Sequence, residues 1–170
     1  QGMLPGVQVF VDSPLAISAT EIFKANPDCY DEEARALLES DDHPLDFANL
    51  KFTVTAEESK ALNNIQSGAI IISASGMCDA GRIKHHLKHN LWRPECTVLI
   101  VGYQAEGTLG RRLVDGEKKV TIHGEKISVS ARIESIEAYS AHADRNGLME
   151  WLDAMKKKPS ITIRSNLSNP

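Results

Sequence analysis

Three continuous apolar segments, each followed by a turn and a helical pattern, constrain the fold of this chain most strongly. They are Val7–Val11, Ala69–Ala74 and Thr97–Gly102. A strand that is apolar at every position has both faces buried, which is typical of parallel sheets with helices on both sides. Amphipathic patterns of helical period lie between these segments. The sequence therefore predicts an α/β fold with a mainly parallel three-layer sheet.

Local signals predict where helices begin. Ser13 suits an N-cap and Pro14 the first helical position. Thr55 followed by Glu58 matches a capping box. Asp79 is expected to cap the helix that follows the second apolar segment.

The pattern changes after Lys118, where polar and apolar residues alternate. Val120–His123 and Lys126–Ile136 are expected to pair as a hairpin, with His123–Gly124 at its turn. A helix with one apolar stripe is expected over Asp144–Lys157. This part is typical of a different, mixed α/β layer.

Composition limits the class of protein. The net charge of -4 argues against a sequence-independent nucleic-acid binder, although a cleft needs only a local basic patch. The three cysteines show no CxxC spacing, which fits free thiols in a reducing compartment. Neither a membrane span nor a signal peptide is visible, so we expect a cytoplasmic protein without membrane contact. Both ends look cut, so we expect a fragment.

Four polar or glycine-rich turns come directly after predicted strands. They are Asp12–Ser13, Ser73–Met77, Gly102–Thr108 and Tyr139–Asp144. Ligands of open parallel sheets bind outside the carboxyl ends of the strands. We therefore expect these turns to converge on one cleft.

The first two turns could each bind a ligand or only shape the chain. Asp12 and Ser13 lie at a helix N-terminus, which favours anions, but a simple cap explains them too. The small residues around Ser75, Gly76 and Met77 would let a ligand approach the backbone. A tight turn without a ligand is the alternative.

The third turn is rich in hydrogen-bond donors. Tyr103, Gln104 and Thr108 can donate, and Arg111 and Arg112 follow. Arginine matches phosphate geometry. A solvated loop before a helix is the alternative interpretation.

His142 lies between small residues, including Ser140, just before a predicted helix. Its side chain could donate a proton or bind a phosphate, and Asp144 could orient it. A structural histidine at a helix start is the alternative. A second group, His85, His86 and His89, predicts a basic helix surface more readily than a metal site, because no HExxH motif is present.

Together these motifs resemble one family. The motifs, in order, are Asp12–Ala16, Ser75–Met77, Gly81–Leu87, Gly102–Gly110 and Ser140–Asp144. This order is similar to that of the β-CASP nucleases of the metallo-β-lactamase fold. The resemblance implies that residues 1–116 form a β-CASP domain and residues 117–170 a C-terminal piece of the metallo-β-lactamase αββα domain.

The resemblance also implies a zinc-dependent ribonuclease. Family members hold two zinc ions through residues upstream of this chain and a late histidine, where this chain has Ile161–Asn166. We therefore expect no zinc and no nuclease activity in this fragment. His142 is the expected catalytic residue of the parent, which would cleave single-stranded RNA and could form a homodimer. The expected substrate-binding residues are Asp12, Ser13, Ser75, Gly76, Met77, Tyr103, Thr108 and Ser140.

Two other functions remain open at the level of sequence. A non-catalytic α/β module that binds RNA or a protein is one, and the acidic net charge favours a protein partner. A small-molecule hydrolase of the same superfamily is the other. The inserted β-CASP motifs argue against it, because a small substrate would not need them.

Overall fold

The computed structural model describes residues 6–39, 45–136, 143, 145–156 and 160. Its strands are β1 (Gln8–Asp12), β2 (Leu50–Phe52), β3 (Ala69–Ser73), β4 (Thr97–Ile100), β5 (Lys119–Ile122), β6 (Glu125–Ser128) and β7 (Arg132–Ser135). Its α-helices are α1 (Pro14–Ala25), α2 (Glu32–Glu39), α3 (Ala56–Ala61), α4 (Arg82–Asn90), α5 (Leu109–Val114) and α6 (Arg145–Asp153). Two 3-10 helices, η1 (Pro27–Cys29) and η2 (Leu62–Asn64), complete the set. None of these helices is long and apolar enough to cross a bilayer.

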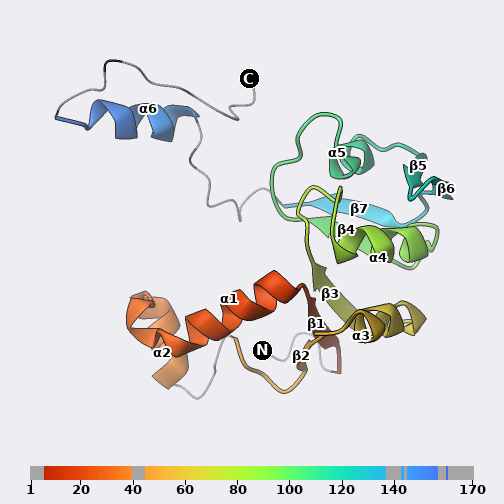
Figure 1. Cartoon of the computed structure of the whole chain (residues 1–170), viewed down its shortest axis with the longest axis horizontal. Coiled ribbons are helices and arrows are strands. Elements are labelled where there is room, and N and C mark those ends of the chain that lie inside the picture. Colours follow the sequence, from red (N-terminus) through yellow and green to blue (C-terminus); the bar gives the residue numbers. More distant parts are fainter. Residues whose placement is uncertain (1–5, 40–44, 137–142, 144, 157–159, 161–170) are drawn as a thin grey trace.

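Parallel pairs dominate the sheets (Figure 1). β1 lies between β2 and β3 and is parallel to both, while β4 is parallel to β7. Only the β5–β6 pair, among the described strands, is antiparallel. The expected α/β class with mainly parallel strands is confirmed. One detail differs, because β3 and β4 do not pair and the parallel strands fall into two sheets.

Two predicted helix starts are confirmed. Ser13 is the N-cap of α1, and its Oγ accepts the N–H of Ala16 at 3.4 Å, with Pro14 in the first turn. At α3 the Thr55 hydroxyl accepts the N–H of Glu58 at 3.1 Å, and the Glu58 carboxylate accepts the N–H of Thr55 at 2.9 Å. Local sequence suffices here because all the atoms lie within one turn.

The expected role of Asp79 as the cap of α4 is wrong. Gly81 holds the N-cap position, with a φ of 75°. The Asp79 carboxylate instead accepts the N–H of Leu109 at 2.9 Å, at the start of α5. Free N–H groups at a helix start attract a carboxylate from any part of the chain. Tertiary packing therefore directs Asp79 to the first turn of α5, whose N-cap is Thr108.

The hairpin expected over residues 120–136 is shorter than predicted. β5 and β6 pair around His123–Gly124, whose φ values of 50° and 79° suit a two-residue type I′ turn. The N–H groups of Ser130 and Ala131 both donate to the Leu91 carbonyl, at 2.8 and 2.9 Å. These bonds direct the chain away from the hairpin, so β7 pairs with β4 instead of extending β6.

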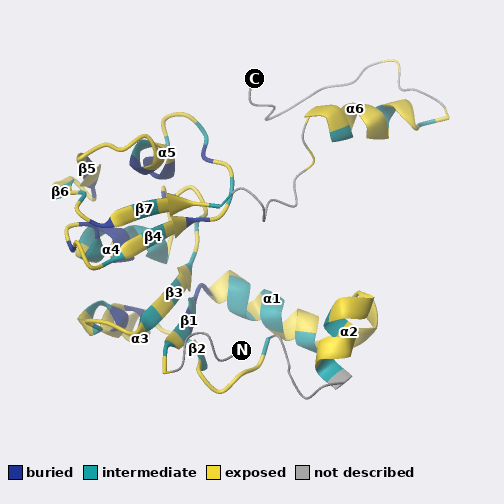
Figure 2. Ribbon diagram, turned by 180° about the vertical axis from the view of Figure 1, so that it is seen from behind, coloured by how far each residue is buried: buried dark blue, intermediate teal, exposed yellow. Residues whose placement is uncertain are grey.

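The contiguous hydrophobic core lies around α4, β4, α5 and β5. Its buried members are Cys78, Leu87, Leu91, Ile100, Leu109, Leu113, Val120, Ile122 and Ala131. The sheet of β1, β2 and β3 contributes fewer buried apolar residues, and α1 has none (Figure 2). Most of the buried apolar packing among the described residues therefore lies in the part of the chain from α4 to β5.

The start of α4 depends on the absence of a side chain at Gly81. A Cβ there would overlap the carbonyl oxygen of Ala74, and the φ of 75° is unfavourable for other residues. We expect Gly81→Ala to lower the free energy of unfolding by about 2–4 kcal/mol, measured by urea unfolding. The matched control is Gly116→Ala, which has a φ of 82° and no heavy atom near the added Cβ. That control should lose only about 1 kcal/mol from strain, and equal losses would contradict the explanation.

Candidate functional site

The first two predicted turns lie together at the carboxyl ends of β1 and β3. Asp12 is opposite Ser73 in the parallel register. The Ser73 hydroxyl donates to the Asp12 carbonyl at 3.0 Å. Beyond β3, the N–H of Ser75 donates to the Ala80 carbonyl at 3.1 Å and closes the turn. The sheet edge thus brings together two segments that are distant in sequence.

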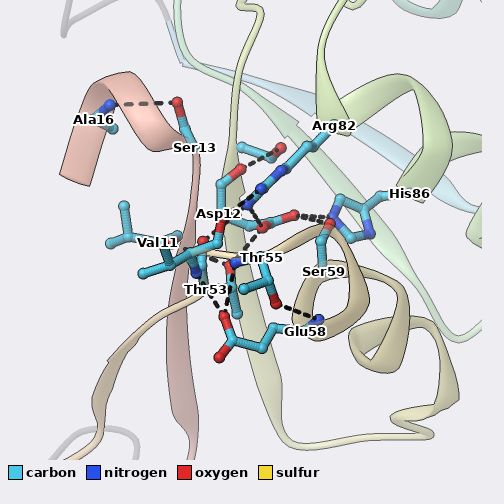
Figure 3. A network of polar contacts seen from close by, with 12 residues as sticks. Val11, Asp12, Ser13, Ala16, Thr53, Thr55, Glu58, Ser59, Arg82 and His86 are labelled. Atoms are coloured by element: carbon cyan, nitrogen blue, oxygen red, sulfur yellow. Dashed lines mark hydrogen bonds and ion pairs between the residues drawn. The ribbon is translucent and has the colours of Figure 1, made fainter. Parts of the chain in front are cut away.

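The Asp12 carboxylate is fully buried and has four side-chain partners (Figure 3). Its Oδ2 accepts from the Ser59 hydroxyl at 2.7 Å and lies 2.6 Å from His86 Nε2. Its Oδ1 accepts from Arg82 Nη1 at 2.8 Å and from the Thr53 hydroxyl. Ser59 belongs to α3, and Arg82 and His86 belong to α4. One carboxylate therefore fixes two helices against the end of β1.

Arg82 and His86 extend this network to further groups. Arg82 donates to the backbone carbonyls of Thr53 and Val54, at 2.8 Å each. His86 Nδ1 lies 3.1 Å from the Asn63 side-chain oxygen. The network thereby includes the segment after β2 and the 3-10 helix η2.

The hydrogen bonds decide the charge state of Asp12. Burial alone would raise the pKa of this carboxyl, but the bonds from Thr53, Ser59, His86 and Arg82 outweigh burial and lower the pKa below 3.8. A carboxylate has about four acceptor positions, and all four are used here. Asp12 is therefore charged at neutral pH and has no acceptor left for a ligand.

Gln104 attaches the third predicted turn to the second. Its buried side-chain amide donates to the Gly76 carbonyl at 2.9 Å and also to the carbonyls of Gly102 and Tyr103, at 3.2 and 3.1 Å. The N–H of Gly110 donates to the Met77 carbonyl at 3.0 Å. A Cβ at Gly110 would overlap the Gln104 side-chain oxygen, so glycine allows this close approach. The predicted convergence of these two turns is confirmed.

The edge offers an aromatic ring, a thioether and exposed backbone to a ligand. Tyr103 is 57% exposed and Met77 is 37% exposed. The hydroxyls of two other predicted residues are engaged within the fold. Thr108 donates to the Ala105 carbonyl at 2.7 Å, and the Ser75 hydroxyl donates to the Ala80 carbonyl at 3.3 Å. A ligand would meet Tyr103, Met77 and Gly76 first.

The remaining predicted residues lie in the interior or outside the described part. Asp12 and Ser13 are buried, so they can position the edge but do not present polar groups to solvent. His142 and Ser140 fall outside the described residues, and their roles stay predictions.

Sequence reasoning missed three partners of Asp12. Thr53, Ser59 and Arg82 lie 41, 47 and 70 residues further along the chain. Arg82 falls in a motif that pointed to the family, but nothing local indicated its partner. Such distant pairs leave no periodic or spacing signal in a single sequence.

The histidines of α4 divide between interior and surface. His86 is buried in the Asp12 network, whereas His85 is exposed and stacks on His123, with ring centroids 4.6 Å apart. Lys88 pairs with Glu125 at 2.6 Å. Among the residues that the structure describes, no group of three or more His, Cys, Asp or Glu side chains could hold a metal ion. The described residues therefore do not fit a zinc centre.

This chain is an α/β protein that gathers polar turns at the carboxyl ends of parallel strands, which is where open parallel sheets bind their ligands. Residues 1–113 match the Beta-Casp domain family, and residues 126–165 match the Zn-dependent metallo-hydrolase RNA specificity domain. The chain belongs to the β-CASP family of metallo-β-lactamase-fold RNA nucleases, as the resemblance of its motifs predicted.

Three curated relatives illustrate this membership. Ribonuclease TTHA0252 of Thermus thermophilus is 33% identical over 88% of this chain and 35% of its own length. An RNase J-like protein of Methanocaldococcus jannaschii is 33% identical over 95% of this chain and 36% of its own length. The transcription termination factor FttA of Methanosarcina mazei is 27% identical over 94% of this chain and 26% of its own length. The chain thus spans between about a quarter and a third of these relatives.

Replacing Asp12 with asparagine tests the buried network. Asp12→Asn keeps the shape of the side chain but leaves Arg82 without its charged partner. We expect the free energy of unfolding at neutral pH to fall by about 3–5 kcal/mol, because a broken buried pair leaves an uncompensated charge. Chemical denaturation of both proteins measures this difference.

The same pair predicts a pH dependence. The folded-state pKa of Asp12 is lowered, so its stabilisation is fully present above about pH 4 and is lost as the pH falls toward the lowered pKa. The stability difference between wild type and Asp12→Asn should therefore shrink in acid. Asp115→Asn is the control, because Asp115 pairs with Arg111 on the surface and should contribute little. A difference that stays constant into strong acid would contradict the assignment.

Proposed function

We propose that this chain is the RNA-binding part of a zinc-dependent ribonuclease that hydrolyses phosphodiester bonds. The observation that carries the proposal is the attachment of the Gly102–Thr108 turn to the Gly76–Met77 turn through Gln104. This contact creates a shared surface at the strand ends, where ligands of parallel sheets bind. The names of the relatives and the RNA specificity domain support RNA as the ligand.

We further propose how the edge would hold single-stranded RNA. Tyr103 would stack on a base, since stacking on an aromatic ring tolerates any sequence. Met77 would pack beside that base, and the exposed backbone near Gly76 would approach the sugar–phosphate chain. The polar groups of four other predicted residues are hydrogen-bonded within the fold, so these residues would hold the edge in shape and would not bond to the RNA. They are Asp12, Ser13, Ser75 and Thr108.

The catalytic part of the proposal concerns the full-length enzyme. Bound zinc would supply an activated hydroxide and stabilise the charge of the transition state. His142 would contact the scissile phosphate or protonate the leaving oxygen, and Ser140 would help to bind the RNA. Residues 1–116 would form a β-CASP domain, and residues 117–170 would form a C-terminal piece of the metallo-β-lactamase domain. The 170-residue chain by itself would have no nuclease activity. A cytoplasmic location and a homodimer also remain proposals.

A non-catalytic module that binds a protein is the second candidate. The net charge of -4 favours it, because RNA binding usually accompanies a basic surface. Salt dependence separates the two functions. Affinity for RNA falls steeply with salt, because phosphate contacts release counterions.

Binding of fluorescent single-stranded RNA to this chain tests the stacking role. We expect Tyr103→Ala to weaken binding roughly 5- to 150-fold, as for the loss of about 1–3 kcal/mol of base stacking. The matched control is Trp92→Ala, because Trp92 is 58% exposed but follows α4, at the opposite end of the strands. Fluorescence anisotropy at several salt concentrations measures both variants. Equal losses in both, or binding indifferent to salt, would exclude the proposed surface.

Replacement of His142 in the full-length enzyme tests the catalytic role. We expect His142→Ala to lower the rate of RNA cleavage by about 100-fold or more while RNA affinity changes little, as for loss of a general acid. Single-turnover cleavage and equilibrium binding separate these effects. Cleavage at an unchanged rate would remove His142 from the mechanism.

A further inference from the structure

Helix α4 and the turn between β5 and β6 carry a group of basic side chains that the candidate site does not use. They are Lys84, His85, Lys88 and His89 of α4 and His123 of the turn. The three histidines are exposed, and the two lysines are half-buried. We call this group the α4–turn patch. The basic helix surface predicted from the sequence is thus extended by a histidine from a separate part of the chain.

Two contacts hold the turn against the helix (Figure 1). The rings of His85 and His123 stack with centroids 4.6 Å apart and planes inclined by 26°. The Lys88 ammonium pairs with the Glu125 carboxylate at 2.6 Å. The two lysines of the patch outnumber this glutamate, and protonation of the histidines adds further positive charge. A chain with a net charge of -4 therefore concentrates basic groups on one small surface.

Lys84 occupies an electrostatically unfavourable position within the first turn of α4. The first turn of a helix favours negative charge, and α2 and α3 both carry glutamates there. The first turn of α4 has no acidic residue. The Lys84 ammonium donates to the Asp79 carbonyl at 3.2 Å, and this partner is uncharged. Lys84 and the positive end of the helix dipole therefore both attract an anion.

His123 is also placed where a negative group is missing. Its φ of 50° belongs to a turn position that favours asparagine, so the turn alone does not explain a histidine. Partial desolvation and the nearby His85, Lys84 and Lys88 lower the pKa of His123 below 6.5, while Glu125 acts in the opposite direction. A phosphate beside the ring would supply negative charge and favour the protonated imidazole.

The composition of this surface favours nucleic acid over a protein partner. Among the described residues, the large hydrophobic side chains that are exposed include none from α4, β5 or β6. Protein interfaces usually have an apolar or aromatic centre, whereas contacts to phosphate need only cations and hydrogen-bond donors. The patch also adjoins the candidate site, because Asp79, the partner of Lys84, lies two residues after Met77.

We propose that the α4–turn patch binds phosphate groups of the RNA beyond the strand-end edge. Protonated rings of His85, His89 and His123 donate N–H bonds to phosphate oxygens, and Lys84 and Lys88 contribute charge. Binding of RNA is then coupled to uptake of protons by the histidines. The inference rests on the proposed function, since it takes RNA as the ligand, and it adds a second contact surface to the one around Tyr103.

The pH dependence of RNA binding tests this coupling. Phosphate beside His123 raises its pKa, so the complex holds more protons than the free chain and affinity rises as the pH falls. We expect single-stranded RNA to bind the 170-residue chain roughly 3- to 10-fold more tightly at about pH 6 than at about pH 8. The salt dependence should also be steeper at the lower pH, because more cations contact phosphate. Affinity independent of pH would overturn the proposal.

A double variant assigns the pH dependence to the patch. His85→Gln and His123→Asn together remove the stacked imidazoles, and asparagine suits the turn, so the fold should be retained. Urea unfolding checks that stability is unchanged or higher. We expect the double variant to lose most of the gain in affinity at low pH. A pH dependence equal to that of the wild type would place the titrating group elsewhere and overturn the proposal.

A pair of single variants tests the contribution of charge. Lys84→Ala should weaken RNA binding by about 2- to 10-fold, as for one exposed phosphate contact. Lys60→Ala is the control, because Lys60 is exposed on α3 and its loss changes the net charge by the same amount. Equal effects of the two variants would mean that only net charge matters, which would overturn the patch as a site.

The same measurements separate this inference from the proposed function. Tyr103→Ala should lower the affinity by the same factor at both pH values, because tyrosine does not titrate in this range. If Tyr103→Ala has no effect while the double variant loses the pH dependence, the stacking role fails and the patch stands. Polyglutamate is the probe for an acidic protein partner. Tighter binding of polyglutamate than of RNA of equal charge would overturn the choice of ligand.

Discussion

The buried carboxylate of Asp12 is the interaction on which the candidate site depends. Its four partners come from α3, from α4 and from the segment after β2. A buried charge is stable only when it is paired and hydrogen-bonded, so this position tolerates little change in the surrounding geometry. The network therefore fixes the end of β1 relative to the start of α4. These two points determine the geometry of the candidate site at the carboxyl ends of the strands.

A second, neutral interaction completes the edge. Gln104 donates to three carbonyls and attaches the turn after β4 to the turn after β3. The hydrogen bond from the Leu109 N–H to the Asp79 carboxylate strengthens the same attachment. The two interactions differ in purpose: the Asp12 network orders the interior, while the Gln104 contact brings Tyr103 and Met77 to the surface.

Much of the local structure could be predicted from sequence. The positions of the strands, the Ser13 cap and the Thr55 capping box depend on neighbouring residues, and all agree with the structure. The expected burial of both strand faces is wrong for β3 and β4, where Ile72 and Leu99 are about half exposed. Strand residues were expected where β7 lies, but its pairing with β4 could not be predicted, because bonds from Ser130 and Ala131 to the distant Leu91 direct the chain there. The site was predictable as a set of turns, but the interior position of Asp12 was not. A carboxylate before a helix can face solvent or the core, and only its distant partners decide.

The sequence by itself determined the α/β class, the positions of the turns and the membership of the β-CASP family. These follow from hydrophobic periodicity, capping chemistry and ordered motifs, which act over short stretches of chain. Only the tertiary structure decided that Asp12 is buried and fully hydrogen-bonded, that Gln104 joins two turns, and that β3 and β4 lie in separate sheets. Such features arise from contacts between residues tens of positions apart, and chain packing, unlike local propensity, is not encoded in any single window of sequence.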